Sequence, residues 1–321
     1  MHARLTLALL HAGAPLHHLW SGWTWTPGIV LPLAASAILY ARGLQALGIR
    51  GGAATGTPRT RRGMRRWETT AFWTGWGILV LALVSPVHPL SEQLFSVHMV
   101  QHELLMVVAA PLLVLGRPLV PFLWALPRST RQQLATVSHR PVVRTVWGVV
   151  TRPLSAWLLH AAAIWIWHVP RFFELTLANA AVHALQHACF LFTGLLFWWS
   201  LVHGRRAPNE GPRAAGYVAA VLYLFTTALH TSALGALLTF SHTLWYPAYA
   251  STAASWNLTP LEDQQLAGLI MWIPGSVEYL IAALALLATA LRAAEARTVS
   301  RERAAATSAL WPAPSYEDYT S

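Results

Sequence analysis

Residues 93–115 read QLFSVHMVQHELLMVVAAPLLVL, and this stretch decides the fold class. It is long enough to cross a membrane as one helix, because about 20 mostly apolar residues span the hydrocarbon core. Six other stretches have the same character. We therefore expect an all-α integral membrane protein with seven transmembrane helices, at residues 28–47, 69–86, 93–115, 153–169, 180–202, 214–240 and 264–291.

The composition agrees with a membrane protein and excludes a soluble domain. Of the 321 residues, 55% are hydrophobic and 11% are charged, whereas soluble domains carry about 25% charged residues. The net charge of +10 comes from arginines that lie between the apolar stretches, so we expect a lipid bilayer and no nucleic acid as partner. Cys189 is the single cysteine of the sequence, which excludes an intrachain disulfide and a CxxC metal site.

The arginines also predict the orientation. They gather in the loops at residues 48–68 and 116–152, whereas Arg4 and Arg171 fall on the opposite side. Because cytoplasmic loops are rich in positive charge, the N-terminus is expected outside and the C-terminus in the cytoplasm. This gives an outer N-terminal arm (1–27), a transmembrane domain (28–291) and a disordered cytoplasmic tail (292–321). The arm begins with a short apolar run of the kind found in signal peptides, but we favour an uncleaved arm.

Two expected spans contain the same pattern, HxxQH. It occurs as His98–His102 in the third span and as His183–His187 in the fifth. Histidines four residues apart lie on one helix face and can share a metal ion. Both helices enter from the same side, so a rise of about 1.5 Å per residue places both pairs in the outer layer. A single histidine in a membrane helix is more often a helix contact than a ligand, but the repeated pair favours metal or cofactor binding.

Other polar residues are expected near these four histidines. His88 and His168 fall at the same level and are additional candidate ligands. The residues that we expect to surround or support the ligands are Met99, Gln101, Glu103, Gln186, Glu278 and Trp272. A Pro274–Gly275 step is expected to interrupt the last span. Imidazole suits copper, zinc and iron, and Cu(II) binds most strongly among divalent first-row ions, so copper is the expected metal.

Several segments together resemble the CtaG family of cytochrome c oxidase (caa-type) assembly factors. They are SP at 85–86, LFSVHMVQH at 94–102, APLLVLGRP at 110–118, WHVP at 167–170, QH at 186–187 and DQQLAGLIMW at 263–272. The resemblance implies a seven-helix protein of the bacterial inner membrane that assembles a terminal oxidase. It also implies the oxidase subunits as partners, with copper delivery as the usual proposed role.

The residues leave other functions open. One histidine from the third span and one from the fifth are also suitable axial ligands for a b-type haem. A histidine-held zinc ion with Glu103 as base would make a membrane hydrolase, although the HExxH pattern is absent from the sequence. We expect a non-enzymatic protein that binds copper at the outer histidine cluster and aids its delivery to the oxidase.

Overall fold

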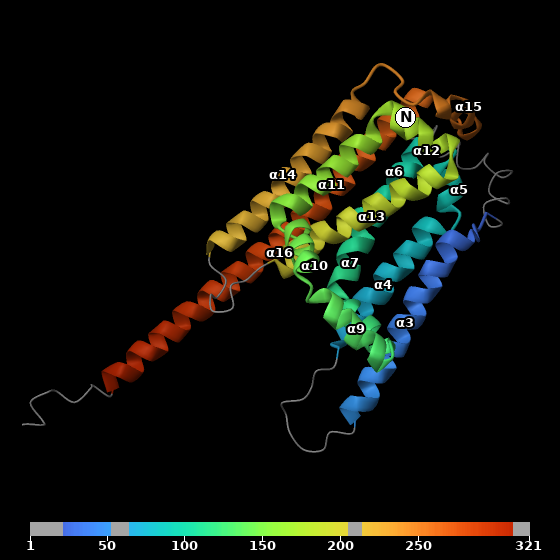
Figure 1. Cartoon of the computed structure of the whole chain (residues 1–321). Coiled ribbons are helices and arrows are strands. Elements are labelled where there is room, and N and C mark those ends of the chain that lie inside the picture. Colours follow the sequence, from blue (N-terminus) through green and yellow to red (C-terminus); the bar gives the residue numbers. More distant parts are fainter. Residues whose placement is uncertain (1–21, 53–63, 205–213, 311–321) are drawn as a thin grey trace, which may run out of the picture.

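The computed structural model describes residues 22–52, 64–204 and 214–310, and these form helices and connections without a strand. One set of segments packs side by side as a bundle (Figure 1). It consists of α3 (Pro27–Gly52), α4 (Arg66–Leu83), α6 (Phe95–Glu103), the π-helix η2 (Leu104–Ala109), α7 (Ala110–Leu115), α11 (Pro153–His168), α13 (Ala180–His203), α14 (Ala214–Thr239) and α16 (Pro260–Leu310). The connecting segments are α5 (Val87–Ser91), α8 (Leu119–Ala125), α9 (Arg128–Ser138), α10 (Pro141–Val150), α12 (Pro170–Ala178), η3 (Pro247–Tyr249), α15 (Ala250–Ala253) and η4 (Ala254–Trp256).

The helices confirm a multi-pass membrane protein. They do not confirm the expected count of seven spans. Five described helices are long and apolar enough to cross a membrane: Pro27–Gly48, Phe95–Leu115, Ala180–His203, Gly216–Thr239 and Pro260–Arg303. A sixth span results if α10 and α11, which meet at a bend of 66°, are counted as one. The expected spans at 69–86 and 153–169 are not among these five. The charged residues Arg66 and Glu68 lower the hydropathy of α4, and α11 alone has only 16 residues.

Two expectations about the C-terminal part are wrong. The Pro274–Gly275 step does not interrupt the last span, because α16 continues through it. A proline in a membrane helix leaves one carbonyl without its usual partner, and neighbouring groups can compensate for this. The helix also continues beyond residue 291 to Leu310, where we expected a disordered tail. Residues 292–310 are rich in alanine and arginine, which favour helix. Residues 1–21 of the predicted arm and 311–321 of the tail lie outside the described residues.

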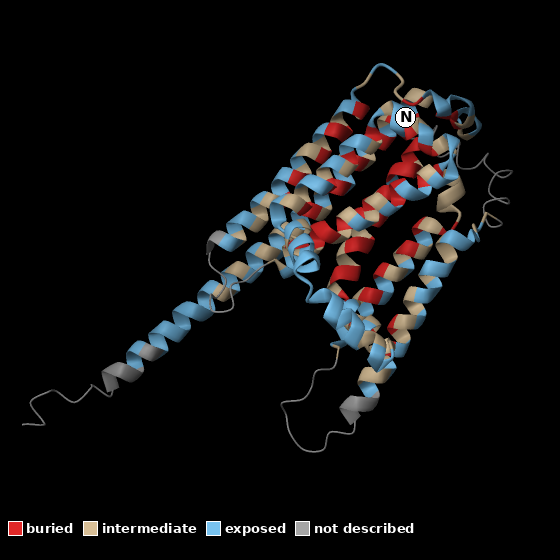
Figure 2. Cartoon of the chain, viewed as in Figure 1, coloured by how far each residue is buried: buried red, intermediate tan, exposed pale blue. Residues whose placement is uncertain are grey.

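The third span is not a regular α-helix. It is formed by α6, η2 and α7 in succession, so a π-helical segment lies in its middle. The Trp198 indole of α13 donates a hydrogen bond to the Met106 carbonyl of this segment, at 3.0 Å. Gly194 of α13 faces Met106 and Ala110 at contact distance. These contacts hold α13 against the third span, and buried residues concentrate there (Figure 2).

The start of α6 is fixed by a residue of α16. Leu94 precedes the helix and has no side chain that can cap it. The Asp263 carboxylate instead accepts hydrogen bonds from the backbone N–H groups of Phe95, at 2.7 Å, and Ser96, at 3.1 Å. A carboxylate at a helix N-terminus satisfies free donors and interacts favourably with the helix dipole. Asp263 thereby sets the position of α6, which carries two of the predicted ligands.

Candidate metal centre

The structure brings all six predicted histidine ligands together. They come from four elements: His88 from α5, His98 and His102 from α6, His168 from α11, and His183 and His187 from α13. The ring centroids of His98 and His183 are 5.0 Å apart, and those of His102 and His187 are 5.6 Å apart. The two HxxQH pairs therefore face each other across the bundle at matching depth.

The rings are buried, and several of their nitrogens have no hydrogen-bond partner. His102 is 2% exposed and lacks a partner at both Nδ1 and Nε2. The Nε2 atoms of His183 and His187 also lack one. A buried polar atom without a partner costs about 1–3 kcal/mol. Unpartnered imidazole nitrogens that converge in a buried site are the arrangement expected for metal ligands.

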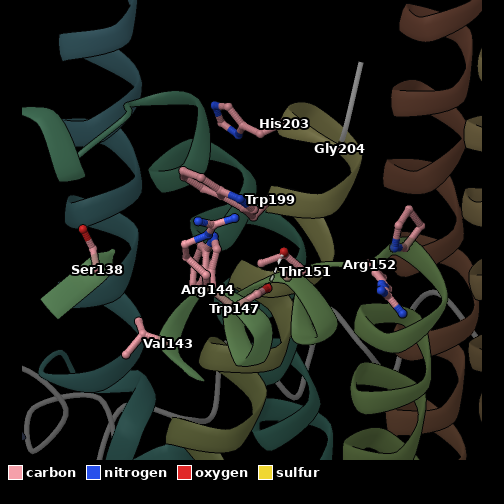
Figure 3. A pocket seen from close by; sticks show the side chains of 11 residues that line it. Ser138, Val143, Arg144, Trp147, Thr151, Arg152, Trp199, His203 and Gly204 are labelled. Carbon is pink, nitrogen blue, oxygen red and sulfur yellow. Dashed lines mark hydrogen bonds between the residues drawn. The ribbon is translucent and has the colours of Figure 1, made fainter. Parts of the chain in front are cut away.

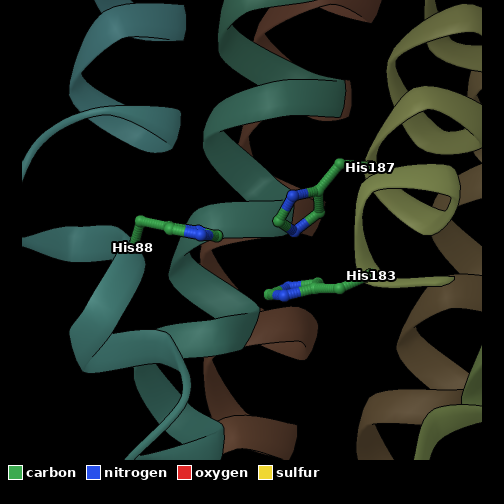
Figure 4. Close-up of side chains that lie close together, drawn as sticks. All are labelled: His88, His183 and His187. Atoms are coloured by element: carbon green, nitrogen blue, oxygen red, sulfur yellow. The ribbon is translucent and has the colours of Figure 1, made fainter. Parts of the chain in front are cut away.

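Two groups of three histidines are close enough to hold an ion. The outer triad is His88, His183 and His187, and the inner triad is His98, His102 and His187. Within each triad the ligand atoms lie within 4.8 Å of one another. Figure 4 shows the three rings of the outer triad turned toward a common space. Metal–nitrogen bonds are about 2.0 Å long, so small side-chain movements would complete either triad.

His98 is held with one nitrogen directed to the cluster. Its Nδ1 lies 3.3 Å from the Ser91 carbonyl and 3.0 Å from the Tyr249 hydroxyl. That hydroxyl also donates to the Ser91 carbonyl, at 2.9 Å. The Ser91 carbonyl favours a proton on Nδ1, whereas the Gln186 Oε1 atom, 3.3 Å from Nε2, favours a proton on Nε2. The Nδ1 tautomer leaves a lone pair on Nε2 and requires the Gln186 amide to turn its NH2 group toward that atom. A carbonyl contact behind the ring is typical of metal-ligating histidines.

His168 and Met99 place two electron-pair donors in contact. His168 Nδ1 donates to the Ile164 carbonyl at 2.7 Å, which leaves the lone pair on Nε2. That Nε2 lies 3.4 Å from the Met99 Sδ atom. In the neutral ring no proton lies between them, so each of the two atoms offers a lone pair at this point. The His168 ring is 6.1 Å from that of His102, next to the inner triad.

Each glutamine of the HxxQH patterns contacts a histidine of another element. Gln186 Oε1 of α13 lies 3.3 Å from His98 Nε2. The Gln101 amide of α6 contacts His88 Nδ1 at 3.1 Å and donates to the Ala82 carbonyl at 2.6 Å. The two glutamines therefore link the histidine pairs to each other and to α5, as expected for supporting residues.

Glu103, Glu278 and Trp272 do not support the histidines as we expected. Glu103 is packed against Gly275 of α16. Within residues 64–204 and 214–310, neither carboxylate makes a hydrogen bond to a histidine, and each has an unpartnered Oε2. Trp272 packs against α14, with its ring 5.7 Å from that of Phe240. The reason is geometric: Glu103 follows His102 by about 100° around the helix, so it faces α16 and not α13.

Burial favours the neutral form of His88, which lies on the short helix α5 between α4 and α6. His88 is half-buried, and desolvation lowers its pKa, an effect that the nearby Glu92 charge partly offsets. Its ring is therefore neutral near pH 7, and a neutral imidazole is the form that binds a metal.

Tyr249, Ser91 and Asp263 belong to the site, although the sequence analysis did not select them as site residues. Tyr249 and Asp263 lie far from the histidines in sequence. Ser91 lies only seven residues before His98, but it contributes a backbone carbonyl, which no sequence pattern marks. Among the described residues, other histidines such as His160 and His242 lie outside the cluster. His160 hydrogen-bonds Thr193 at 3.1 Å, whereas His242 is exposed in the connection after α14.

A cavity lies at the end of α13 that is far from the histidine cluster. It has a volume of about 690 Å³ and is lined by Arg144 and Trp147 of α10 and by Trp199 and His203 of α13, among others (Figure 3). His203 is 20 residues beyond His183 on the same helix, or about 30 Å along its axis. This cavity is therefore separate from the histidine cluster.

The bundle and its buried imidazoles define a multi-pass membrane protein with a candidate metal centre. Residues 38–293 match the family described as cytochrome c oxidase caa3 assembly factor, and the chain belongs to this family. This confirms the family that the sequence motifs resemble.

Curated relatives come from mycobacteria. Uncharacterised proteins of Mycobacterium bovis and Mycobacterium tuberculosis are each 27% identical over 315 residues, covering 92% of this chain and 46% of theirs. A Mycobacterium leprae protein is 27% identical over 248 residues, covering 74% of this chain and 36% of its own. The chain thus spans less than half the length of these relatives. No solved structure matches it.

Proposed function

We propose that this assembly factor binds a copper ion at the histidine cluster and passes it to cytochrome c oxidase subunits during assembly. The observation that carries the proposal is the convergence of unpartnered imidazole nitrogens from His102, His183 and His187. We further propose a bacterial inner-membrane location with the cluster near the extracytoplasmic face, because the arginine-rich loops belong on the cytoplasmic side.

The donor set favours copper over harder ions. Imidazole nitrogens and the Met99 thioether surround the site, and the carboxylates face elsewhere. Nitrogen and thioether ligands suit Cu(I) and Cu(II), whereas carboxylate oxygens suit magnesium, calcium and manganese. A site without thiolates also lets a carrier release its ion to an acceptor.

The other two functions have less support. Across the two helices, the rings of His98 and His183 are 5.0 Å apart, those of His102 and His187 are 5.6 Å apart, and Phe190 of α13 lies 4.5 Å from His102. Such close packing offers no slot for a porphyrin between the helices. A zinc hydrolase needs a base beside the metal, and Glu103 faces α16.

Metal analysis of purified protein tests the proposal. The wild type is expected to bind about one copper ion per chain. His187→Ala should lose most of it, because His187 belongs to both triads, whereas His102→Ala should hold the ion more weakly, because it removes an unpartnered donor of the inner triad only. His139→Ala, which changes an exposed histidine at the end of α9, is the matched control. Oxidase activity should fall in cells that carry either cluster variant. Full copper content and normal oxidase activity in both variants would contradict the proposal.

A further inference from the structure

The two triads share one residue, His187. Its buried Nε2 atom has no hydrogen-bond partner. A neutral imidazole has a single nitrogen lone pair, because its other ring nitrogen carries a proton, so the His187 ring can bind only one ion at a time. The outer and inner triads are therefore two alternative positions for a single ion.

The two positions differ in access to solvent. The outer triad includes half-buried His88, on the short helix α5 at the end of the bundle. All three members of the inner triad are buried. Phe173 packs against His98 with ring centroids 4.9 Å apart, and Phe190 covers His102. An ion that arrives from water meets the outer triad first.

The two positions also differ in ligand chemistry. The contact between Met99 and His168 adjoins the inner triad through His102, so soft donors are available on the inner side. His102 has two unpartnered nitrogens, and it gives up no hydrogen bond when it binds an ion. The inner position is therefore expected to hold Cu(I) more tightly.

We infer that the cluster is a two-step metal path, in which an ion enters at the outer triad and moves to the inner triad while His187 stays bound. In the inward step the bonds to His88 and His183 break and bonds to His98 and His102 form. The charge of the ion does not change, and no proton or electron is required. This inference rests on the proposed copper binding and assigns an order to its ligands.

Loading and release of Cu(I) in the purified full chain test this order. Cu(I) is supplied under anaerobic conditions, and release is followed with a Cu(I)-selective chelator. We expect the wild type to bind one ion per chain. His102→Ala keeps the outer triad, so it should still load but release the ion at least about tenfold faster, because losing a ligand should cost no less than losing a residue that supports one.

Changes to the outer triad should have the opposite effect. His88→Ala and His183→Ala keep the inner triad, so each should retain one ion but load and release it about tenfold more slowly. Two variants are used because His88 and His183 lie on different helices, and gel filtration with a thermal melt checks that each is folded. His139→Ala is again the control.

The outcomes separate this inference from the proposed function. If the wild type binds no Cu(I), the proposed function fails, and the inference fails with it. If the wild type binds one ion but His88→Ala and His183→Ala load at the wild-type rate, the two-step path alone is wrong. Two tightly held ions per wild-type chain would also overturn it, because the triads would then be independent sites.

Discussion

At the scale of single residues, the orientation of each imidazole depends on groups behind it. The Tyr249 hydroxyl and the Ser91 carbonyl contact His98 Nδ1 and favour the tautomer with the proton on that atom. The Ile164 carbonyl does the same for His168. These contacts leave lone pairs inside the cluster before any metal arrives, and such pre-orientation raises metal affinity.

Removing the hydroxyl behind His98 should weaken the site without removing a ligand. For Tyr249→Phe we expect about tenfold lower affinity for Cu(I) and an unchanged fold, because the ring remains and His98 loses one orienting contact. Competition titration against a Cu(I) chelator measures the change. Tyr217→Phe, on α14, is the matched control. Equal affinity in wild type and Tyr249→Phe would show that the contact has no role in binding.

At the scale of elements, the position of α6, the first segment of the third span, is set at both of its ends. Asp263 caps the start of α6, and the π-helical segment η2 begins directly after Glu103. π-Helical turns are rare and occur often at functional sites, because they rotate the residues on either side relative to a regular helix. The register of His98 and His102 toward α13 therefore depends on two features outside the HxxQH pattern.

Loss of the cap should destabilise α6 and disturb the metal site together. Asp263→Ala removes acceptors for two backbone N–H groups, so we expect about 1–2 kcal/mol lower stability, together with weaker Cu(I) binding. Thermal unfolding in detergent and chelator competition measure the two effects. Glu302→Gln changes an exposed acid of the same helix and serves as control. A variant with unchanged melting temperature would refute the role of this cap.

At the scale of the whole molecule, the arginine-rich loops predict which end of the bundle faces the cytoplasm. In a Cys189→Ser background, we expect His242→Cys to react with a membrane-impermeant thiol reagent in intact spheroplasts. His139→Cys should react only after lysis, because it lies in the loop region at 116–152 that carries many arginines. If His139→Cys reacted in intact spheroplasts and His242→Cys reacted only after lysis, the orientation would be the opposite of the proposed one, with the cluster on the cytoplasmic side.

The sequence predicts the site well where the residues repeat with the period of an α-helix. The spacing of the two HxxQH pairs predicts that their histidines meet, and the structure brings them together. Contacts made by loops and distant helices have no such period, so Tyr249, Ser91 and Asp263 were not predicted. The structure does not confirm the count of seven spans, and it contradicts the expected break at Pro274. Composition does not show how a short helix bends or how a proline is accommodated.

The central claim is that imidazoles from α6 and α13 together hold one copper ion. X-ray absorption spectroscopy of the copper-loaded protein tests it most directly, because imidazole rings give a characteristic scattering pattern. The account predicts imidazole-dominated coordination in the wild type and its loss in His187→Ala, whose ring belongs to both triads. Oxygen-dominated coordination in the wild type, or an identical imidazole signal in His187→Ala, would contradict the account.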